Sequence, residues 1–286
     1  MSDTIASLAR KIGGAQDLQS VVSSMKALAA SSMGEYEQSV SALADYFHTV
    51  ELGLRVCLRD SASLPKNKTT DSDRIGAVVF GSDQGLVGQF NEELVDFALQ
   101  TLSRPASPRI WAVGERVHAR LTDEGLAVLG LFSVPNSVKA ITSLVGRILR
   151  EVHELRELYL FYNRSRSDVI YTPFSQRLLP LDETWRRKMA DRAWPTNQLP
   201  EVIGGGTETL RALIREYLFV SLFRACAESL ASENAGRLAA MQRAEKNIKE
   251  LLEDLEGRFH RLRQSSIDEE LFDVISGFEA LSKYSS

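Results

Sequence analysis

The stretch IASLARKIGGAQDLQSVVSSMKALAASSMGEYEQSVSALADYFHTVELGLRVC, residues 5–57, decides the fold of this chain. Counting in sevens from Ile5 and from Leu8 marks sixteen positions, and fourteen of them are apolar in a chain that is 44% hydrophobic overall. Heptads sustained over this length specify a coiled-coil seam. The pattern therefore predicts a helix of about 55 residues, about 80 Å long at 1.5 Å per residue, whose apolar stripe needs a partner helix.

The two polar exceptions on this stripe, Gln19 and Lys26, are neighbouring positions of one heptad series. One interpretation is that they set the register of the coiled coil or mark a local end of the seam. The alternative is that the seam opens there toward a different partner. Sequence periodicity leaves both open.

A second helical pattern fills the C-terminal end of the chain. After Gly204-Gly205-Gly206, Thr207 is expected to be an N-cap, and Glu208 favours the first turn of the helix. The seam positions that follow at spacings of three and four are Leu238, Met241, Glu245, Ile248, Leu252, Leu255, Phe259 and Leu262, and beyond them Ile267, Leu271, Val274, Phe278 and Leu281 drift in register. A helix is predicted over 207–283, and two seams at opposite chain ends most simply pair antiparallel.

The eight prolines divide the chain into three parts, because none lies in 1–64 and none in 201–286. We expect coiled-coil helices in 1–64 and 201–286 and an α/β domain in 65–200. Within this domain, strands are expected at 75–80, 109–114, 126–132, 157–164 and 168–175. Helices are expected at 89–103, after the second strand as far as about Gly125, and at 138–152. A turn is expected at 165–167 and a loop at 181–200. The predicted fold class is α/β with a long coiled coil: two antiparallel terminal helices and a small inserted Rossmann-like domain with a largely parallel sheet.

Glycines recur inside both predicted arms at spacings close to three heptads. They are Gly14, Gly34, Gly53, Gly236, Gly257 and Gly277. Each costs up to about 1 kcal/mol against alanine in a helix. Close backbone approach could offset that cost, and chance placement is the other explanation.

The segment GSDQGLVG, residues 81–88, follows the first expected strand, where a mononucleotide fold binds phosphate. It matches neither GxGxxG nor GxxxxGK[ST], and no lysine follows to reach a phosphate. We therefore expect a tight strand-to-helix turn rather than a nucleotide site.

Composition and motifs exclude several function classes. The net charge of −4 gives no support to nucleic-acid binding, and no apolar run is long enough to span a membrane. The N-terminus lacks a secretory-signal layout, and two cysteines, Cys57 and Cys226, are too few for a disulfide framework or a zinc site. The four histidines are scattered and no catalytic motif is present, so we expect no catalytic residue, cofactor or metal and a reducing, cytoplasmic compartment.

Four separated segments, in order along the whole chain, resemble one known family. They are VVSSMKALAASSM (21–33), GSDQGLVGQFN (81–91), LASENAGRLAAMQRAEKN (230–247) and LRQSSIDEELFDVISGFEAL (262–281). The resemblance is to the gamma subunit of F-type ATP synthases.

This resemblance implies a mechanical function. The family's gamma subunit is the central rotor shaft, which couples ion flow through the membrane sector to ATP synthesis or hydrolysis at the beta subunits. Its partners would be the alpha and beta subunits of the catalytic ring, the epsilon subunit and the membrane c-ring. The resemblance implies a peripheral location at the cytoplasmic face of a bacterial or archaeal cell membrane, with no membrane insertion.

The resemblance also assigns roles to individual residues. Met25, Lys26 and Arg237 would contact the surrounding ring, with Met25 and Arg237 near the catch of a beta subunit, and Arg263, Gln264 and Glu270 would lie near the upper bearing. The matched residues of the α/β domain's first turn, whose implied role is structural, are Ser82, Asp83, Gly85, Leu86, Gly88 and Asn91.

The chain departs from the family pattern in three segments. IASLARKI (5–12) and SMGEYEQ (32–38) stand where relatives are more basic, and SGFEAL (276–281) replaces an alanine-rich end. With the net charge of −4, these departures suggest a divergent branch, such as the alternative F-type ATPase proposed to move sodium ions.

Two other functions stay open. A non-enzymatic coiled-coil scaffold with a partner-binding α/β domain would not co-purify with alpha and beta subunits. A nucleotide-regulated α/β protein would bind ATP or NAD through the glycine segment.

Overall fold

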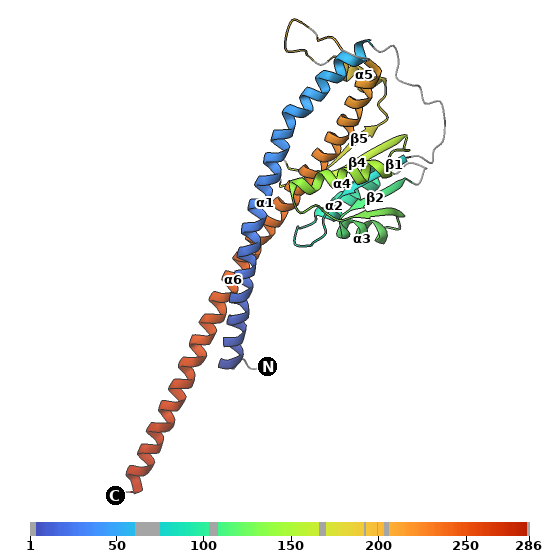
Figure 1. Ribbon diagram of the computed structural model, residues 1–286. Coiled ribbons are helices and arrows are strands. Elements are labelled where there is room, and N and C mark those ends of the chain that lie inside the picture. The colour runs from blue at the N-terminus through green and yellow to red at the C-terminus, as the bar shows by residue number, and fades with distance from the viewer. Residues whose placement is uncertain are drawn as a thin grey trace. The chain divides into compact units, whose positions relative to one another are not determined.

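The computed structural model describes residues 4–60, 75–102, 108–165, 170–191, 193–198, 200–202 and 206–284 (Figure 1). Residue contacts divide it into two compact units: unit 1 comprises Met1–Leu28 with Leu238–Ser286, and unit 2 comprises Ala29–Arg237. The division thus cuts through both long helices, whereas the boundaries expected at 64 and 200 follow the proline map. That three-part division of the chain stays a prediction.

Two long helices form the terminal arms. Helix α1 is Ile5–Asp60 and helix α6 is Gly206–Tyr284, close to the predicted bounds. All sixteen heptad positions of α1 are buried or half-buried, which confirms the predicted seam. Thr4 and Ser7 cap α1 reciprocally, each backbone N–H donating to the other's hydroxyl oxygen at 3.0 and 3.2 Å. Thr207 was expected to be an N-cap, but α6 already begins at Gly206, so this detail was wrong.

In unit 1, the N-terminal part of α1 runs antiparallel to α6 (Figure 1). The half-buried Lys26 ammonium lies 2.6 Å from the carboxylate of Glu245, a charged residue on the seam of α6, so these two charges neutralise one another. This pairing favours the register-setting interpretation of Lys26. Beyond Leu262 the described side chains of α6 are almost all exposed, and Phe272 and Val274 are each 70% exposed.

Unit 2 contains one five-stranded sheet in the order β3-β2-β1-β4-β5. The strands are β1 (Ile75–Phe80), β2 (Arg109–Val113), β3 (Val128–Phe132), β4 (Glu157–Arg164) and β5 (Thr172–Leu179). The first four are parallel and β5 is antiparallel to β4, which confirms the largely parallel sheet. The last strand lies at 172–179 rather than 168–175, and the expected turn at 165–167 lies mostly outside the described residues.

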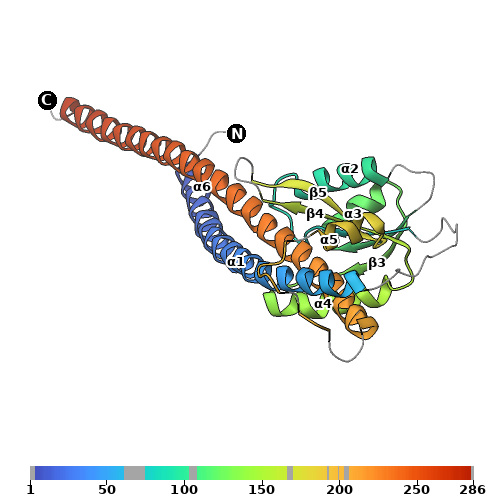
Figure 2. The same ribbon diagram turned by 90° about the horizontal axis from the view of Figure 1, so that it is seen from above.

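Helices cover both faces of the sheet (Figure 2). α2 (Phe90–Leu102) and α3 (Glu115–Asp123) bury one face, whose core includes Val79, Ala112 and Phe161. α4 (Val138–Glu151) and the unit 2 parts of α1 and α6 bury the other, whose core includes Phe80, Leu54 and Leu222. The insertion therefore shares its core with the terminal helices.

One helix falls in the region expected to be a loop. α5 (Glu183–Ala190) begins after Asp182, whose carboxylate accepts a hydrogen bond from the Trp185 N–H. This bond and the Arg177 guanidinium lower the pKa of Asp182. The expectation of a loop over 181–200 was wrong at this point, because eight residues carry too little periodicity to indicate a helix.

Of the glycines in the arms, Gly236 is the one where a side chain would be excluded by backbone. A Cβ there would lie 2.9 Å from the Val87 carbonyl oxygen and 2.9 Å from Tyr171, whereas Gly14, Gly34 and Gly257 have nothing within 4 Å. Close approach thus explains Gly236, and chance placement is sufficient for those other three.

Replacing Gly236 by alanine is therefore expected to destabilise the protein by about 1–3 kcal/mol, because α6 must move away from the Val87 carbonyl. The matched control in the same helix is Gly257→Ala, which is expected to stabilise it by about 0.5–1 kcal/mol. Urea unfolding of both variants gives the comparison, and equal effects would contradict the packing explanation.

Candidate functional site

The segment after β1 is a hydrogen-bonded turn. The Ser82 N–H donates to Asn91 Oδ1 at 3.0 Å, and Asn91 Nδ2 donates back to Ser82 Oγ at 2.9 Å, with both residues buried. Asn91 stands in the first turn of α2. The reciprocal bonds therefore fix the direction in which the chain enters that helix.

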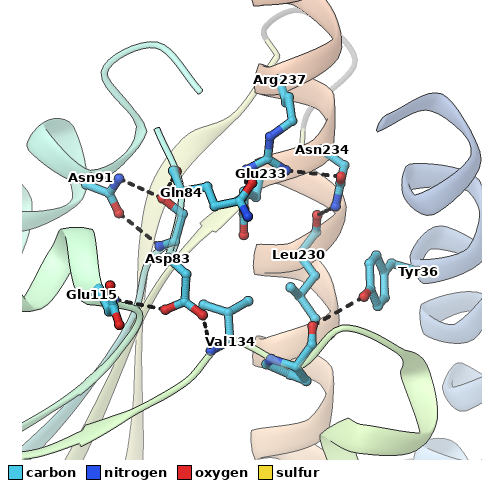
Figure 3. Close-up of polar contacts among 12 residues, drawn as sticks. Tyr36, Asp83, Gln84, Asn91, Glu115, Val134, Leu230, Glu233, Asn234 and Arg237 are labelled. Atoms are coloured by element: carbon cyan, nitrogen blue, oxygen red, sulfur yellow. Dashed lines mark hydrogen bonds and ion pairs between the residues drawn. The ribbon is translucent and has the colours of Figure 1, made fainter. Parts of the chain in front are cut away.

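Asp83 joins the ends of three adjacent strands. Its Oδ1 accepts a hydrogen bond from the Glu115 N–H at 3.0 Å, and its Oδ2 accepts one from the Val134 N–H at 2.9 Å (Figure 3). Glu115 begins α3 after β2, and Val134 follows β3. A single carboxylate thus holds together the segments that leave β1, β2 and β3.

The rest of the turn has an unusual backbone. Gly88 has a φ of 72°, and Leu86, the one described non-glycine residue with a positive φ, has a φ of 63°. A leucine in this conformation costs free energy, and its side chain is 61% exposed. At Gly85 a Cβ would meet only the end of Arg116 at 3.8 Å. The structure thus brings the six predicted turn residues together, and their purely structural role stays a prediction.

Helix α6 covers the carboxyl end of β1. Ser229 Oγ donates to the Phe80 carbonyl oxygen at 2.9 Å, and Gly236 of the same helix contacts Val87. From β4, Asn163 Nδ2 donates to the Phe90 carbonyl oxygen at 2.9 Å. Nucleotide-binding sheets hold their ligand at such a point, where the strand order reverses. Here protein groups occupy it, which favours the tight turn over a phosphate site.

A polar cleft of about 280 Å³ lies beside this turn within unit 2. It is lined from α1, the β1 turn, the segment after β3 and α6 by Ser32, Tyr36, Asp83, Gln84, Val134, Pro135, Asn136, Leu230, Glu233, Asn234 and Arg237. Arg237, which the family resemblance singled out, is therefore a lining residue of this cleft.

A buried ion pair on α6 lines the cleft. Arg237 Nη2 lies 2.6 Å from Glu233 Oε1, and the two side chains are only 13% and 7% exposed. Arg237 Nη1 also donates to Asn234 Oδ1 at 3.3 Å (Figure 3). Burial raises the pKa of Glu233 and outweighs the opposite effect of Arg237. Arg237 thus compensates a carboxylate that is costly to bury.

Tyr36 of α1 forms another wall of the cleft. Its hydroxyl donates to the Pro135 carbonyl oxygen at 3.4 Å. Burial, with the nearby Glu35, Cys226 and Glu233, raises the pKa of Tyr36 to about 12. Sequence reasoning missed both Tyr36 and Glu233. The available signal for Glu233 was its position four residues before Arg237, a spacing that places opposite charges together on a helix.

The other predicted contact residues lie in unit 1. Met25 and Lys26 are half-buried on α1, and Arg263, Gln264 and Glu270 are exposed on α6. Their predicted partners belong to other chains, so these contacts stay predictions.

Two further features of the described residues bear on function. Across these parts of the chain, no group of three or more His, Cys, Asp or Glu side chains is placed to hold a metal ion. None of the helices that the structure describes has the length and hydropathy needed to cross a membrane.

Comparison with known proteins gives one consistent family. The family model described as ATP synthase matches residues 4–281. The chain is 27% identical to the ATP synthase gamma chain of Moorella thermoacetica, over 96% of this chain and 98% of that one. It is also 27% identical to the gamma chain of Syntrophus aciditrophicus, over 96% of this chain and 97% of that one.

Solved structures share the fold. The rotor of the Euglena gracilis mitochondrial ATP synthase superimposes with a TM-score of 0.65 at 18% identity, covering 92% of this chain and 98% of that chain. The central stalk and c-ring structure of the Tetrahymena thermophila mitochondrial ATP synthase gives a TM-score of 0.55 at 19% identity, covering 78% of this chain and 99% of that chain.

Proposed function

Since this chain belongs to the ATP synthase gamma-chain family, we propose that it is the central-stalk rotor of an F-type ATP synthase. In this role it couples ion flow through the membrane sector to ATP synthesis or hydrolysis at the beta subunits by rotation. The observation that carries the proposal is the family match over residues 4–281, on a fold of two long terminal helices with an inserted α/β domain.

The proposed partners are the alpha and beta subunits of the catalytic ring, the epsilon subunit and the membrane c-ring. Three structures of similar fold have titles that name their assemblies. One is a rotor, one is a central stalk with a c-ring, and one is an assembly of OSCP, F1 and c-ring. These titles support a position between a catalytic sector and a membrane ring.

The geometry of unit 1 suits a shaft. Two helices packed along a common seam resist bending better than either alone, and the Lys26–Glu245 pair fixes their register. Beyond Leu262, α6 presents exposed apolar side chains such as Phe272 and Val274, which suit a surrounding sleeve of other subunits. Within the same proposal, Met25, Lys26 and Arg237 contact the ring.

The upper bearing is proposed to involve Arg263, Gln264 and Glu270, which are exposed on α6. The turn made by Ser82, Asp83 and Asn91, with Gly85, Leu86 and Gly88, is proposed to be structural. Its hydrogen bonds support that role because they connect β1 with α2, α3 and the end of β3.

We propose that the chain contributes no catalytic residue of its own and acts as a non-catalytic subunit. It would be peripheral, at the cytoplasmic face of a bacterial or archaeal cell membrane. The gamma chains of Moorella thermoacetica and Syntrophus aciditrophicus support a prokaryotic source. The divergent sodium-type branch stays a prediction.

Purification of the native complex tests the function. A tagged chain, extracted from membranes in mild detergent, is expected to bring down alpha and beta subunits, epsilon and the c-ring in the stoichiometry of a rotary ATP synthase. The complex should hydrolyse ATP, whereas the isolated chain should not. Recovery of the chain alone or with unrelated proteins would favour the scaffold function instead.

A further inference from the structure

Helix α6 buries a second carboxylate, one turn before the cleft described above. Glu228 is 7% exposed. Its Oε1 accepts a hydrogen bond from Arg224 Nε at 2.8 Å, a contact within α6. Its Oε2 lies 3.4 Å from Arg164 Nε, at the end of β4. One carboxylate is therefore shared between an arginine of the helix and an arginine of the sheet.

The sheet side of this contact is itself held in place. The Arg164 guanidinium lies over the Phe174 ring of β5, 5.6 Å from its centroid, which adds a cation–π attraction. Tyr162, two residues earlier on β4, is also buried beside Glu228, and first burial and then the Glu228 charge raise the pKa of its phenol. Arg164 is thus positioned by two strands toward a carboxylate of α6.

The next residue of α6 makes a second polar contact with the sheet. Ser229 is 3% exposed, and its hydroxyl donates to the carbonyl oxygen of Phe80, the last residue of β1, at 2.9 Å. Successive residues of one helix therefore connect to two neighbouring strands, β4 and β1. Apolar packing is non-directional, whereas a hydrogen bond such as Ser229–Phe80 depends on distance and angle. The Glu228–Arg164 contact at 3.4 Å is an ion pair and not a hydrogen bond, so it adds an attraction that weakens with distance. These two contacts resist sliding and rotation of the helix on the sheet.

We propose that the Glu228–Arg164 ion pair and the Ser229–Phe80 hydrogen bond, here called the helix–sheet tie, transmit torque between the α/β domain and α6. This inference rests on the proposed rotor function, in which the membrane ring drives the α/β domain and α6 acts on the catalytic sector. Glu228, Arg164 and Ser229 are then positioning residues. The tie keeps the part of α6 that lies in unit 2 fixed on the sheet when the rotor turns against a load.

The cluster offers a matched pair of variants. Arg164→Gln removes the arginine that crosses from sheet to helix, and Arg224→Gln removes the one within α6. Either variant leaves the buried Glu228 carboxylate with one arginine instead of two. If the arginines only compensate the charge of Glu228, the two variants should therefore behave alike. Adding Ser229→Ala to Arg164→Gln removes the second contact of the tie.

The test uses the whole ATP synthase complex carrying each variant, reconstituted into lipid vesicles. ATP hydrolysis is measured with the ion gradient dissipated, and ion pumping per ATP hydrolysed is measured as the gradient builds. For Arg164→Gln/Ser229→Ala we expect ATP hydrolysis near the wild-type rate when no gradient is present. Against a gradient we expect the number of ions pumped per ATP to fall about threefold, as for the loss of one net hydrogen bond. Arg224→Gln should keep the wild-type ratio.

Several outcomes would overturn the tie. A wild-type pumping ratio in the double variant contradicts it, and so does an equal loss in Arg164→Gln and Arg224→Gln, which indicates only local charge compensation. If the double variant does not assemble, the single variants Ser229→Ala and Arg164→Lys are measured instead. Arg164→Lys keeps the positive charge, so it is expected to pump more ions per ATP than Arg164→Gln does. A wild-type chain that neither assembles nor pumps contradicts the proposed function instead.

Discussion

Replacing Gly114 by alanine is expected to destabilise unit 2 by at least about 3 kcal/mol, because backbone strain and a backbone clash coincide there. Gly114 has a φ of 116° and a ψ of 135°, which L-residues rarely adopt. A Cβ would lie 2.7 Å from the carbonyl oxygen of Ser82 and 2.8 Å from its carbon and nitrogen. Neither chain can move away easily, since the Gly114 N–H donates to the Phe132 carbonyl at 2.8 Å and the Ser82 carbonyl accepts from the Arg116 N–H at 2.9 Å.

The control for this prediction is Gly125→Ala. Gly125 also has a positive φ, 77°, but nothing lies within 4 Å of its Cβ position. Gly125→Ala is therefore expected to lower the free energy of unfolding by only about 1 kcal/mol, the cost of the positive φ alone. Urea unfolding followed by circular dichroism measures both variants. If Gly114→Ala proves no more harmful than Gly125→Ala, the contact with Ser82 is not a constraint.

The second large effect is expected at the buried ion pair of the cleft. Replacing Arg237 by methionine should destabilise the protein by about 3 kcal/mol at neutral pH, because it leaves the Glu233 carboxylate buried without its cation. The Glu233 side chain is 7% exposed, and burial already raises its pKa above the ordinary value of 4.5. Without Arg237, which lowers that pKa, it should rise further.

The pH dependence of this variant follows from the sign of that shift. A carboxyl group with a raised pKa in the folded state binds more protons there than in the unfolded state, so stability falls as pH rises between the two pKa values. Because the folded wild-type protein shares the first part of this loss, the deficit of Arg237→Met relative to wild type should be smallest below the raised pKa of Glu233 in the wild-type protein. It should grow as pH rises from that pKa toward the still higher pKa of the variant. Guanidinium unfolding at a series of pH values measures this.

A double variant separates the charge effect from lost packing. Adding Glu233→Gln to Arg237→Met removes the buried charge and should recover more than half of the stability lost at neutral pH, with little pH dependence. Recovery of nothing, or a deficit in Arg237→Met that does not change with pH, would show that the arginine acts through packing alone.

Periodic features of the chain could be predicted well. The heptads from Ile5 and Leu8 gave α1 and its buried face, because one buried stripe on a helix repeats every three or four residues. Strand segments such as 75–80 were recognisable as short β-branched runs bounded by turn residues. Helix α5 could not be recognised in this way, since its start depends on the single cap at Asp182.

The site followed different rules. The family motif singled out Asn91 and Asp83, but it could not predict their partners. Asp83 accepts hydrogen bonds from residues 32 and 51 positions further along the chain. Ser229 and Phe80 are 149 positions apart. No local pattern encodes such contacts, because they depend on the order of the strands and on which face of α6 meets the sheet.

By itself, then, the sequence determined two long amphipathic helices, an α/β insertion with a largely parallel sheet, and a motif set specific to one family, because these depend on local periodicity and on residue identity. Only the tertiary structure decided that α6 covers the carboxyl end of β1 and that Glu233 forms a buried ion pair with Arg237. It also decided that Glu228 contacts one arginine of α6 and one of the sheet. Burial and charge pairing are properties of surfaces that meet after folding. The same glutamate is a solvated charge on an isolated helix and a costly, compensated one where that helix packs against the sheet.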